Sequence, residues 1–101
     1  MSKLNEDLFA ESQGACQPQS GQTVTGGVYD ELFVAASVSN VTFGDPIFMA
    51  DVTIRGRGHT GTIYVPKTTT TINLGGNNVT VVKETLRQLK QRAGPDQSPL
   101  I

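Results

Sequence analysis

The chain is poor in the residues that build covalent or metal-stabilised sites. It has a single cysteine, Cys16, and a single histidine, His59, among its 101 residues. One cysteine cannot form an internal disulfide, and one thiol with one imidazole falls short of the ligand set of a structural zinc ion. Both kinds of stabilisation are therefore excluded, and we expect no metal and no other cofactor.

Long apolar runs, tryptophan and charge are also scarce. There is no apolar window of about 18 residues and no secretory leader pattern, so we expect a soluble protein with no membrane span that is made in a cytoplasm. Tryptophan is absent, hydrophobic residues make up 37% of the chain and charged residues 17%. Ser, Thr, Gly, Asn and Gln fill the difference, and this mixture favours strands and turns over long amphipathic helices.

The length of 101 residues predicts one domain. From Thr23 onward, short apolar and β-branched runs alternate with Gly, Asn, Asp and Pro about every ten residues, as in a sandwich or barrel. The predicted fold is mostly β: a small single-domain β-sandwich or barrel with short N-terminal and C-terminal helical segments. The predicted strands are 23–29, 32–38, 47–54, 62–65, 69–74 and 79–83.

Turn chemistry predicts how these strands connect. The sequence Gly44-Asp45-Pro46 predicts a turn before the third strand, and residues 75–78, Gly-Gly-Asn-Asn, predict a hairpin loop between the last two. The apolar residues of the strands are expected to form one core. Its predicted members are Val28, Phe33, Phe48, Ile54, Ile63, Ile72, Leu74 and Val81.

The two ends differ from the β domain, which is predicted over residues 23–84. Residues 1–22 form an N-terminal arm, with a short helix over 3–11 and a polar, flexible connector over 12–22. Residues 85–101 are predicted as a basic helix over 85–93, made of good helix formers, followed by a tail.

Charge is distributed unevenly along the chain. Residues 1–53 carry one basic and seven acidic side chains, whereas residues 54–101 carry seven basic and two acidic ones. The sequence is therefore electrically two-ended. Whether the folded protein is two-ended depends on whether strands from the two halves interleave.

The segment Gly56-Arg57-Gly58-His59-Thr60-Gly61 matches the G-x-G-x-x-G pattern of dinucleotide-binding proteins. That pattern requires a helix after the third glycine, but a strand-like run follows here, and no acidic residue occurs between Asp51 and Glu84. We interpret the segment as a mobile, exposed, basic loop between two strands.

Catalysis is not expected, because His59 lies in this loop and Cys16 in the polar connector, so no rigid nucleophile and base are brought together. Nucleic-acid binding is a stronger alternative, since Arg55, Arg57, Lys67 and the basic residues of 83–92 would form a stripe on a small β domain. The aromatic residues fall in strand positions typical of a core, and the acidic pI of about 5.7 argues against this alternative.

The order of several short motifs resembles the lambda-type head-tail joining, or tail-attachment, proteins of long-tailed bacteriophages. The similarity covers roughly residues 6–84. Its motifs are Asp7-Leu8-Phe9, Gly27-Val28-Tyr29-Asp30-Glu31, Pro46-Ile47-Phe48 and the Ile-x-Leu-Gly-Gly-x-x-Val-x-Val run over 72–81.

This resemblance implies a structural virion protein of the neck, not an enzyme, that assembles as a homo-oligomeric ring. Its partners would be the portal-side connector and the tail, and nucleic acid would be met only as packaged DNA passing through a lumen. A capsid decoration protein contacting the capsid, a small nucleic-acid-binding protein and a non-virion binding module stay open as alternatives. The residues expected to contact neighbouring subunits are Leu8, Phe9, Arg55, Arg57, Arg87 and Lys90.

Overall fold

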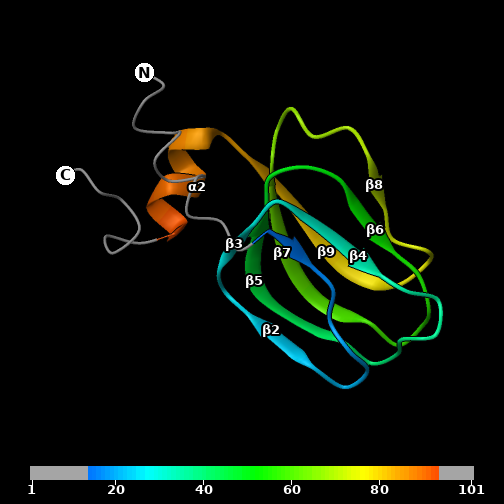
Figure 1. Ribbon diagram of the computed structural model, residues 1–101. Helices are drawn as coiled ribbons and strands as arrows, with labels where there is room; N and C mark the ends of the chain where they lie inside the picture. Colours follow the sequence, from blue (N-terminus) through cyan, green and yellow to red (C-terminus); the bar gives the residue numbers. More distant parts are fainter. Residues whose placement is uncertain (1–13, 94–101) are drawn as a thin grey trace.

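The computed structural model describes residues 14–93, which form short strands and one helix (Figure 1). The predicted helix over 3–11 lies outside the described residues. The elements are β1 Ala15–Cys16, β2 Thr23–Thr25, β3 Val28–Tyr29, β4 Glu31–Val34, β5 Thr42–Phe48, β6 Val52–Ile54, β7 Thr60–Pro66, β8 Ile72–Asn73, β9 Asn78–Glu84 and α2 Leu86–Ala93. The mostly β prediction is confirmed.

The strands form two sheets, and the chain alternates between them. Sheet A has the order β1-β4-β6-β8, and sheet B the order β2-β5-β7-β9, with β3 also paired to β5. Every strand pair among the described residues is parallel. The chain therefore winds as a parallel β-solenoid, in which each coil contributes to both sheets and lies directly after the previous coil.

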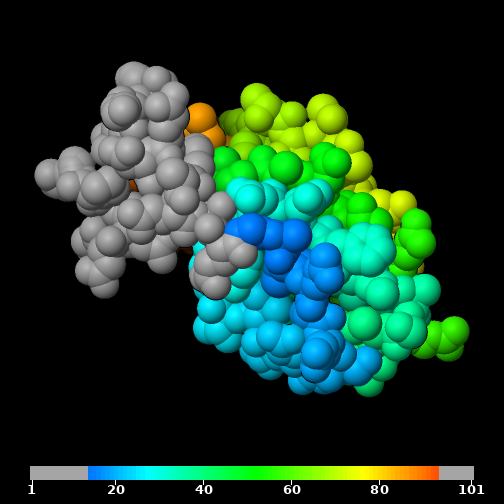
Figure 2. Space-filling view, viewed as in Figure 1, coloured from blue at the N-terminus to red at the C-terminus, as the bar shows by residue number. Residues whose placement is uncertain are grey.

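The coils stack in sequence order. Thr23 pairs with Thr42, Thr42 with Thr60, and Thr60 with Asn78, so one coil takes 18 or 19 residues along this column. In Figure 2 the blue and cyan first coils occupy the middle and lower part of the face shown, and the yellow-green later coils lie at its top. Strands from the two halves of the sequence do not interleave.

Each coil enters sheet B through a residue with a left-handed backbone. Gly21, Asn40, Gly58 and Gly76 have φ between 62° and 81°. Each stands two positions before the paired residue that opens its sheet B rung. Glycine and asparagine tolerate this conformation best, because other side chains clash with the backbone there. A repeated corner of this kind brings successive coils into register.

A buried polar column reinforces that corner. The His59 side chain is 1% exposed; its Nδ1 accepts a bond from the Val41 amide at 3.1 Å, and its Nε2 lies 2.8 Å from the Arg55 carbonyl oxygen. This pairing fixes the tautomer with the proton on Nε2. One coil later, Asn77 Oδ1 accepts from the His59 amide at 3.1 Å. The prediction that His59 lies in an exposed loop is wrong, because these bonds draw it into the interior.

The interior between the sheets is the main hydrophobic core. Phe48, Ile54 and Ile63 lie in it with no exposed surface, as predicted, while Ile72, Leu74 and Val81 are half-buried against it. Val28 is buried in a second cluster outside this core. Phe33 is 41% exposed, so its assignment to the core is wrong. Its neighbours Leu32 and Val34 face the core instead, since side chains alternate along β4.

The predicted hairpin is also wrong. The strands on either side of residues 75–78 belong to different sheets: β8 pairs with β6, and β9 pairs with β7. The turn residues are present, but they carry the chain across the solenoid to the other sheet. Likewise, Gly44, Asp45 and Pro46 do not form a turn before a strand. They lie within β5, where the pairing with β7 shifts register, so the local irregularity is a bulge.

The predicted flexible connector is ordered over its described part. Ala15–Cys16 pairs in parallel with β4, and both Cys16 and Pro18 are buried. This first strand could not be predicted from its own sequence, which has low apolar content, because its order comes from pairing with residues 31 and 32.

The predicted C-terminal helix is confirmed over Leu86–Ala93. Thr85 and Gln88 form a capping box: the Gln88 amide donates to Thr85 Oγ1 at 3.2 Å, and the Thr85 amide donates to Gln88 Oε1 at 2.9 Å. The buried Leu89 joins Val28 and Ile47 in the second hydrophobic cluster. The helix therefore packs back over sheet B, toward the earlier coils.

Replacing Phe48 with Ala should lower the free energy of unfolding by about 3 to 5 kcal/mol, because it leaves a cavity in the main core. Phe33→Ala is the matched control, and its cost should stay below about 1 kcal/mol because Phe33 is exposed. Urea denaturation of both variants tests this expectation. Equal midpoints would contradict the assignment of Phe48 to the core.

The variant His59→Phe keeps an aromatic ring in the corner but removes both side-chain bonds. The buried Val41 amide would be left without a partner, which costs about 1 to 3 kcal/mol, and the part-buried Arg55 carbonyl would lose its bond to the ring. We expect a loss of stability of that order or greater by denaturant unfolding. Unchanged stability would show that the polar column does not hold the corner.

Candidate assembly surfaces at the two ends of the solenoid

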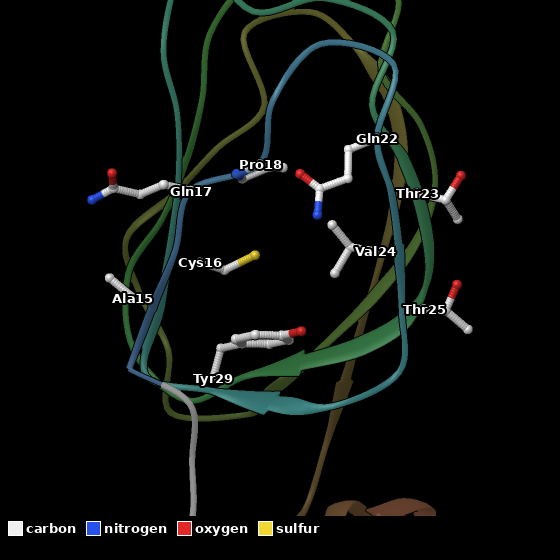
Figure 3. A pocket seen from close by; sticks show the side chains of 9 residues that line it. All are labelled: Ala15, Cys16, Gln17, Pro18, Gln22, Thr23, Val24, Thr25 and Tyr29. Carbon is white, nitrogen blue, oxygen red and sulfur yellow. The ribbon is translucent and has the colours of Figure 1, made fainter.

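The first coil ends in an open hollow of about 500 Å³. Figure 3 shows Cys16, Gln22, Val24 and Tyr29 pointing into this space, whereas Ala15 and Thr23 point away from it. The hollow lies between β1 of sheet A and β2 of sheet B. The hollow is thus the interior of the solenoid at its N-terminal end. In a longer solenoid, a preceding coil would fill this space.

The lining of this hollow is mostly polar, and Cys16 and Tyr29 connect it to the main core. Tyr29 stacks on Phe48 with ring centroids 5.5 Å apart. Burial raises the pKa of the Cys16 thiol to about 11. Burial also raises the pKa of Tyr29, with a further contribution from Cys16. Both groups are therefore neutral at physiological pH and present a largely uncharged surface.

The last coil ends in an unpaired strand edge. β9 runs over seven residues, Asn78–Glu84, and pairs along its whole length with β7 on one side. Within residues 14–93, no strand pairs with its other side. Val81, together with Ile72 and Leu74, is half-buried at this end. An exposed strand edge beside apolar side chains is a template for adding another strand.

Lys83 occupies an unusual place at this end. It pairs with Val65, which is fully buried in the main core, yet Lys83 itself is exposed. The Lys83 side chain therefore lies on the inward face of sheet B, in line with Val65, but at the last strand, where this face meets solvent. A lysine in such a position restricts which strands can add to the edge, because any addition must provide a partner for the ammonium group.

The two ends carry opposite charge. Residues 14–53 hold four acidic side chains and no basic one, whereas residues 54–84 hold four basic and one acidic. The basic residues of α2 are not counted here, because the helix packs back over sheet B toward the earlier coils. Because coils stack in sequence order, this asymmetry of the sequence runs along the axis of the solenoid. Asp30 and Glu31 lie in the first coil, and Lys67 and Lys83 lie in the last two.

Helix α2 leaves the β9 edge uncovered, because Arg92 holds it on the outer face of sheet B. The Arg92 guanidinium binds both carboxylate oxygens of Glu84, at 3.0 and 2.8 Å, and lies 3.7 Å from the centre of the Tyr64 ring. The hydrogen bond from Arg92 lowers the pKa of the Glu84 carboxyl. These contacts fix the direction in which the chain leaves β9.

The predicted contact residues do not form one site. Leu8 and Phe9 lie outside the described residues. Arg55 and Arg57 are exposed at the corner between β6 and β7, where the Arg55 guanidinium carbon lies 6.0 Å from the centre of the Phe33 ring. On α2, Arg87 is exposed and Lys90 is half-buried.

The glycines of the G-x-G-x-x-G match serve the packing of one coil on another. A Cβ at Gly61 would collide with the backbone of Phe43, and one at Gly58 would collide with the Asn40 side chain. The segment then continues as β7, a strand. Among residues 14–93, no three potential metal ligands gather, and no helix is long and apolar enough to span a membrane.

Comparison with known proteins adds no relative: no family model, curated protein or solved structure matches the chain.

Cys16 should react slowly with a thiol-alkylating reagent at pH 8, because its pKa of about 11 leaves a very small fraction as the reactive thiolate. The rate should rise about tenfold per pH unit until the pH approaches 11. Mass spectrometry of timed samples measures the rate, and the urea-unfolded protein is the control. Equal rates in the folded and unfolded protein at pH 8 would contradict the burial of the thiol.

Proposed function

We propose that this protein is a structural subunit that acts by assembling with other protein subunits through the two ends of its solenoid. The observation that carries this proposal is that, over residues 14–93, the ends are open and unlike: a hollow at the first coil, and the unpaired edge of β9 at the last. Unlike ends of opposite charge favour a heterologous contact, in which one surface meets a different surface on its neighbour.

The resemblance to lambda-type head-tail joining proteins suggests where this subunit would assemble: in the neck of a tailed bacteriophage virion. A heterologous contact produces a ring when the rotation between neighbours closes and a linear array when it does not. Either arrangement would leave the exposed corner residues Arg55 and Arg57 free to face the portal side, the tail or passing DNA.

Nucleic-acid binding remains the second candidate, because Phe33 is exposed beside Arg55. An exposed aromatic ring next to an arginine is a pair on which an unpaired base can stack. The sequence alone gave no such platform, since Phe33 was expected in the core.

Mass spectrometry of intact particles purified from the producing cells tests the structural proposal. We expect the protein to co-purify with them in a constant ratio to the other structural proteins. Particles that lack the protein would overturn the proposal.

A binding assay with single-stranded DNA distinguishes nucleic-acid binding from the structural role. A structural subunit should lose any affinity by physiological salt, because only exposed charges are involved. Retained affinity that is lost in the double variant Arg55→Ala, Arg57→Ala would instead support nucleic-acid binding. The double variant Lys67→Ala, Arg87→Ala is the charge-matched control, because it removes two positive charges at other exposed sites.

A further inference from the structure

We propose that the partner at these ends is a second copy of the same chain. The C-terminal end of one copy stacks on the N-terminal end of the next, and both sheets continue in register across the junction. This inference rests on the proposed function, of which it names the partner, and its geometry follows from the pairing columns within one copy.

In sheet A the column is set by three successive pairs. Cys16 pairs with Leu32, Leu32 with Val52, and Val52 with Ile72. The next member of this column would be Cys16 of the following copy, beside Ile72. Strands in a sheet lie about 4.8 Å apart, so the two backbones would approach to that distance.

In sheet B the same reasoning places β2 and β3 of the following copy along the free edge of β9. The column Thr23, Thr42, Thr60, Asn78 continues to Thr23 of the following copy. Two positions further along β9, Thr80 would pair with Thr25 of the following copy. Val79, which lies between Asn78 and Thr80, would pair with Val24 of the following copy in the interior. Every outward position in this first part of the junction is then Thr or Asn, and the inward one is Val.

Further along the edge, Val82 and Lys83 continue two more columns. Val28 pairs with Ile47, Ile47 with Tyr64, and Tyr64 with Val82, so Val82 would meet Val28 of the following copy. The adjacent position brings Lys83 to Tyr29. The aromatic ring and the hydroxyl of Tyr29 in the open hollow are suitable partners for an ammonium group.

The two surfaces are also unlike in form and opposite in charge. Half-buried Ile72, Leu74 and Val81 stand at the C-terminal end, and the hollow of about 500 Å³ lies at the N-terminal end. Stacking would bring the basic coils of one copy next to the acidic first coils of the following one. Attraction between opposite charges steers such encounters, and repulsion between like charges disfavours contacts between two like ends.

Lys83 favours this arrangement over the pairing of two β9 edges. In an antiparallel β9 pair, residues on the same face lie opposite each other, so Lys83 would face Val79, Val81 or the second Lys83. None of these side chains satisfies a buried ammonium group. In the head-to-tail junction, the Lys83 ammonium group would instead contact Tyr29 of the following copy.

A single cysteine substitution tests the register. In the variant Ile72→Cys, the new thiol and Cys16 of one molecule lie three strand spacings apart, about 14 Å, which is beyond the reach of a disulfide. Between stacked copies they would lie about 4.8 Å apart, within its reach. We expect copper-catalysed oxidation at pH 9 to produce a ladder of dimers, trimers and larger species on a non-reducing gel, which dithiothreitol collapses.

Two controls accompany this variant. The double variant Cys16→Ser, Ile72→Cys should give no species beyond a dimer, because each molecule then has one thiol. Phe33→Cys places an exposed thiol on the outer face of β4, away from the junction, and should give no ladder under the same conditions. Absence of a ladder from Ile72→Cys, or an equal ladder from Phe33→Cys, would overturn the stacking register.

Sedimentation of the chain with its native cysteine tests the junction without cross-linking. Association should weaken with added salt, because the two ends attract by charge. Lys83→Glu should raise the dissociation constant at least about tenfold. The same charge change in Arg87→Glu, on the exposed side of α2, should leave it nearly unchanged. Equal effects of the two substitutions would overturn the role of Lys83.

The outcomes separate this inference from the proposed function. A protein that co-purifies with particles but forms neither the ladder nor salt-sensitive oligomers is a structural subunit whose ends bind other proteins, and self-stacking is then wrong. A protein that forms the ladder but is absent from particles stacks with itself, and the particle role is then wrong.

Discussion

Each coil of this solenoid can pair with the previous one only if the chain re-enters sheet B at the same corner. The left-handed residues Gly21, Asn40, Gly58 and Gly76 make that turn in every coil, and His59 binds backbone groups of residues 41 and 55 on either side of it. Consecutive coils approach so closely that a Cβ at Gly61 would meet the Phe43 backbone. The corner thus sets the register on which both sheets and the core depend.

Stacking in register converts sequence order into spatial order. In an antiparallel sandwich, strands from the two halves of the chain interleave, and the acidic and basic halves of this sequence would mix on one surface. Here the strand orders β1-β4-β6-β8 and β2-β5-β7-β9 keep the two halves apart along one axis. The electrical asymmetry and the difference between the two ends are therefore consequences of the same corner.

Local features of the sequence predicted local structure well. The helix follows from Thr85, Gln88 and a run of good helix formers, and buried Phe48, Ile54 and Ile63 follow from apolar residues in strand-like runs. Pairing partners could not be predicted in this way, because alternation and a Gly-Gly-Asn-Asn turn are equally compatible with a hairpin and with a coil. The distinguishing signal is an internal repeat. Residues 21–25, 40–44, 58–62 and 76–80 share Gly or Asn at the first position and mostly Thr at the third and fifth.

A solenoid, unlike a closed barrel, ends with unpaired edges that must be covered, blocked or used. Covering would be the natural role of a C-terminal helix, but Glu84 and Tyr64 hold Arg92 so that α2 lies over sheet B instead of across β9. Blocking is only partial in the part of the chain that the structure describes, since Lys83 protects one interior position while Asn78 to Val82 have no strand on that side. In the stacking proposed above, an edge guarded at this single position would exclude most strands and accept one that brings a partner for the lysine. Such selectivity would distinguish a specific assembly surface from an aggregation site.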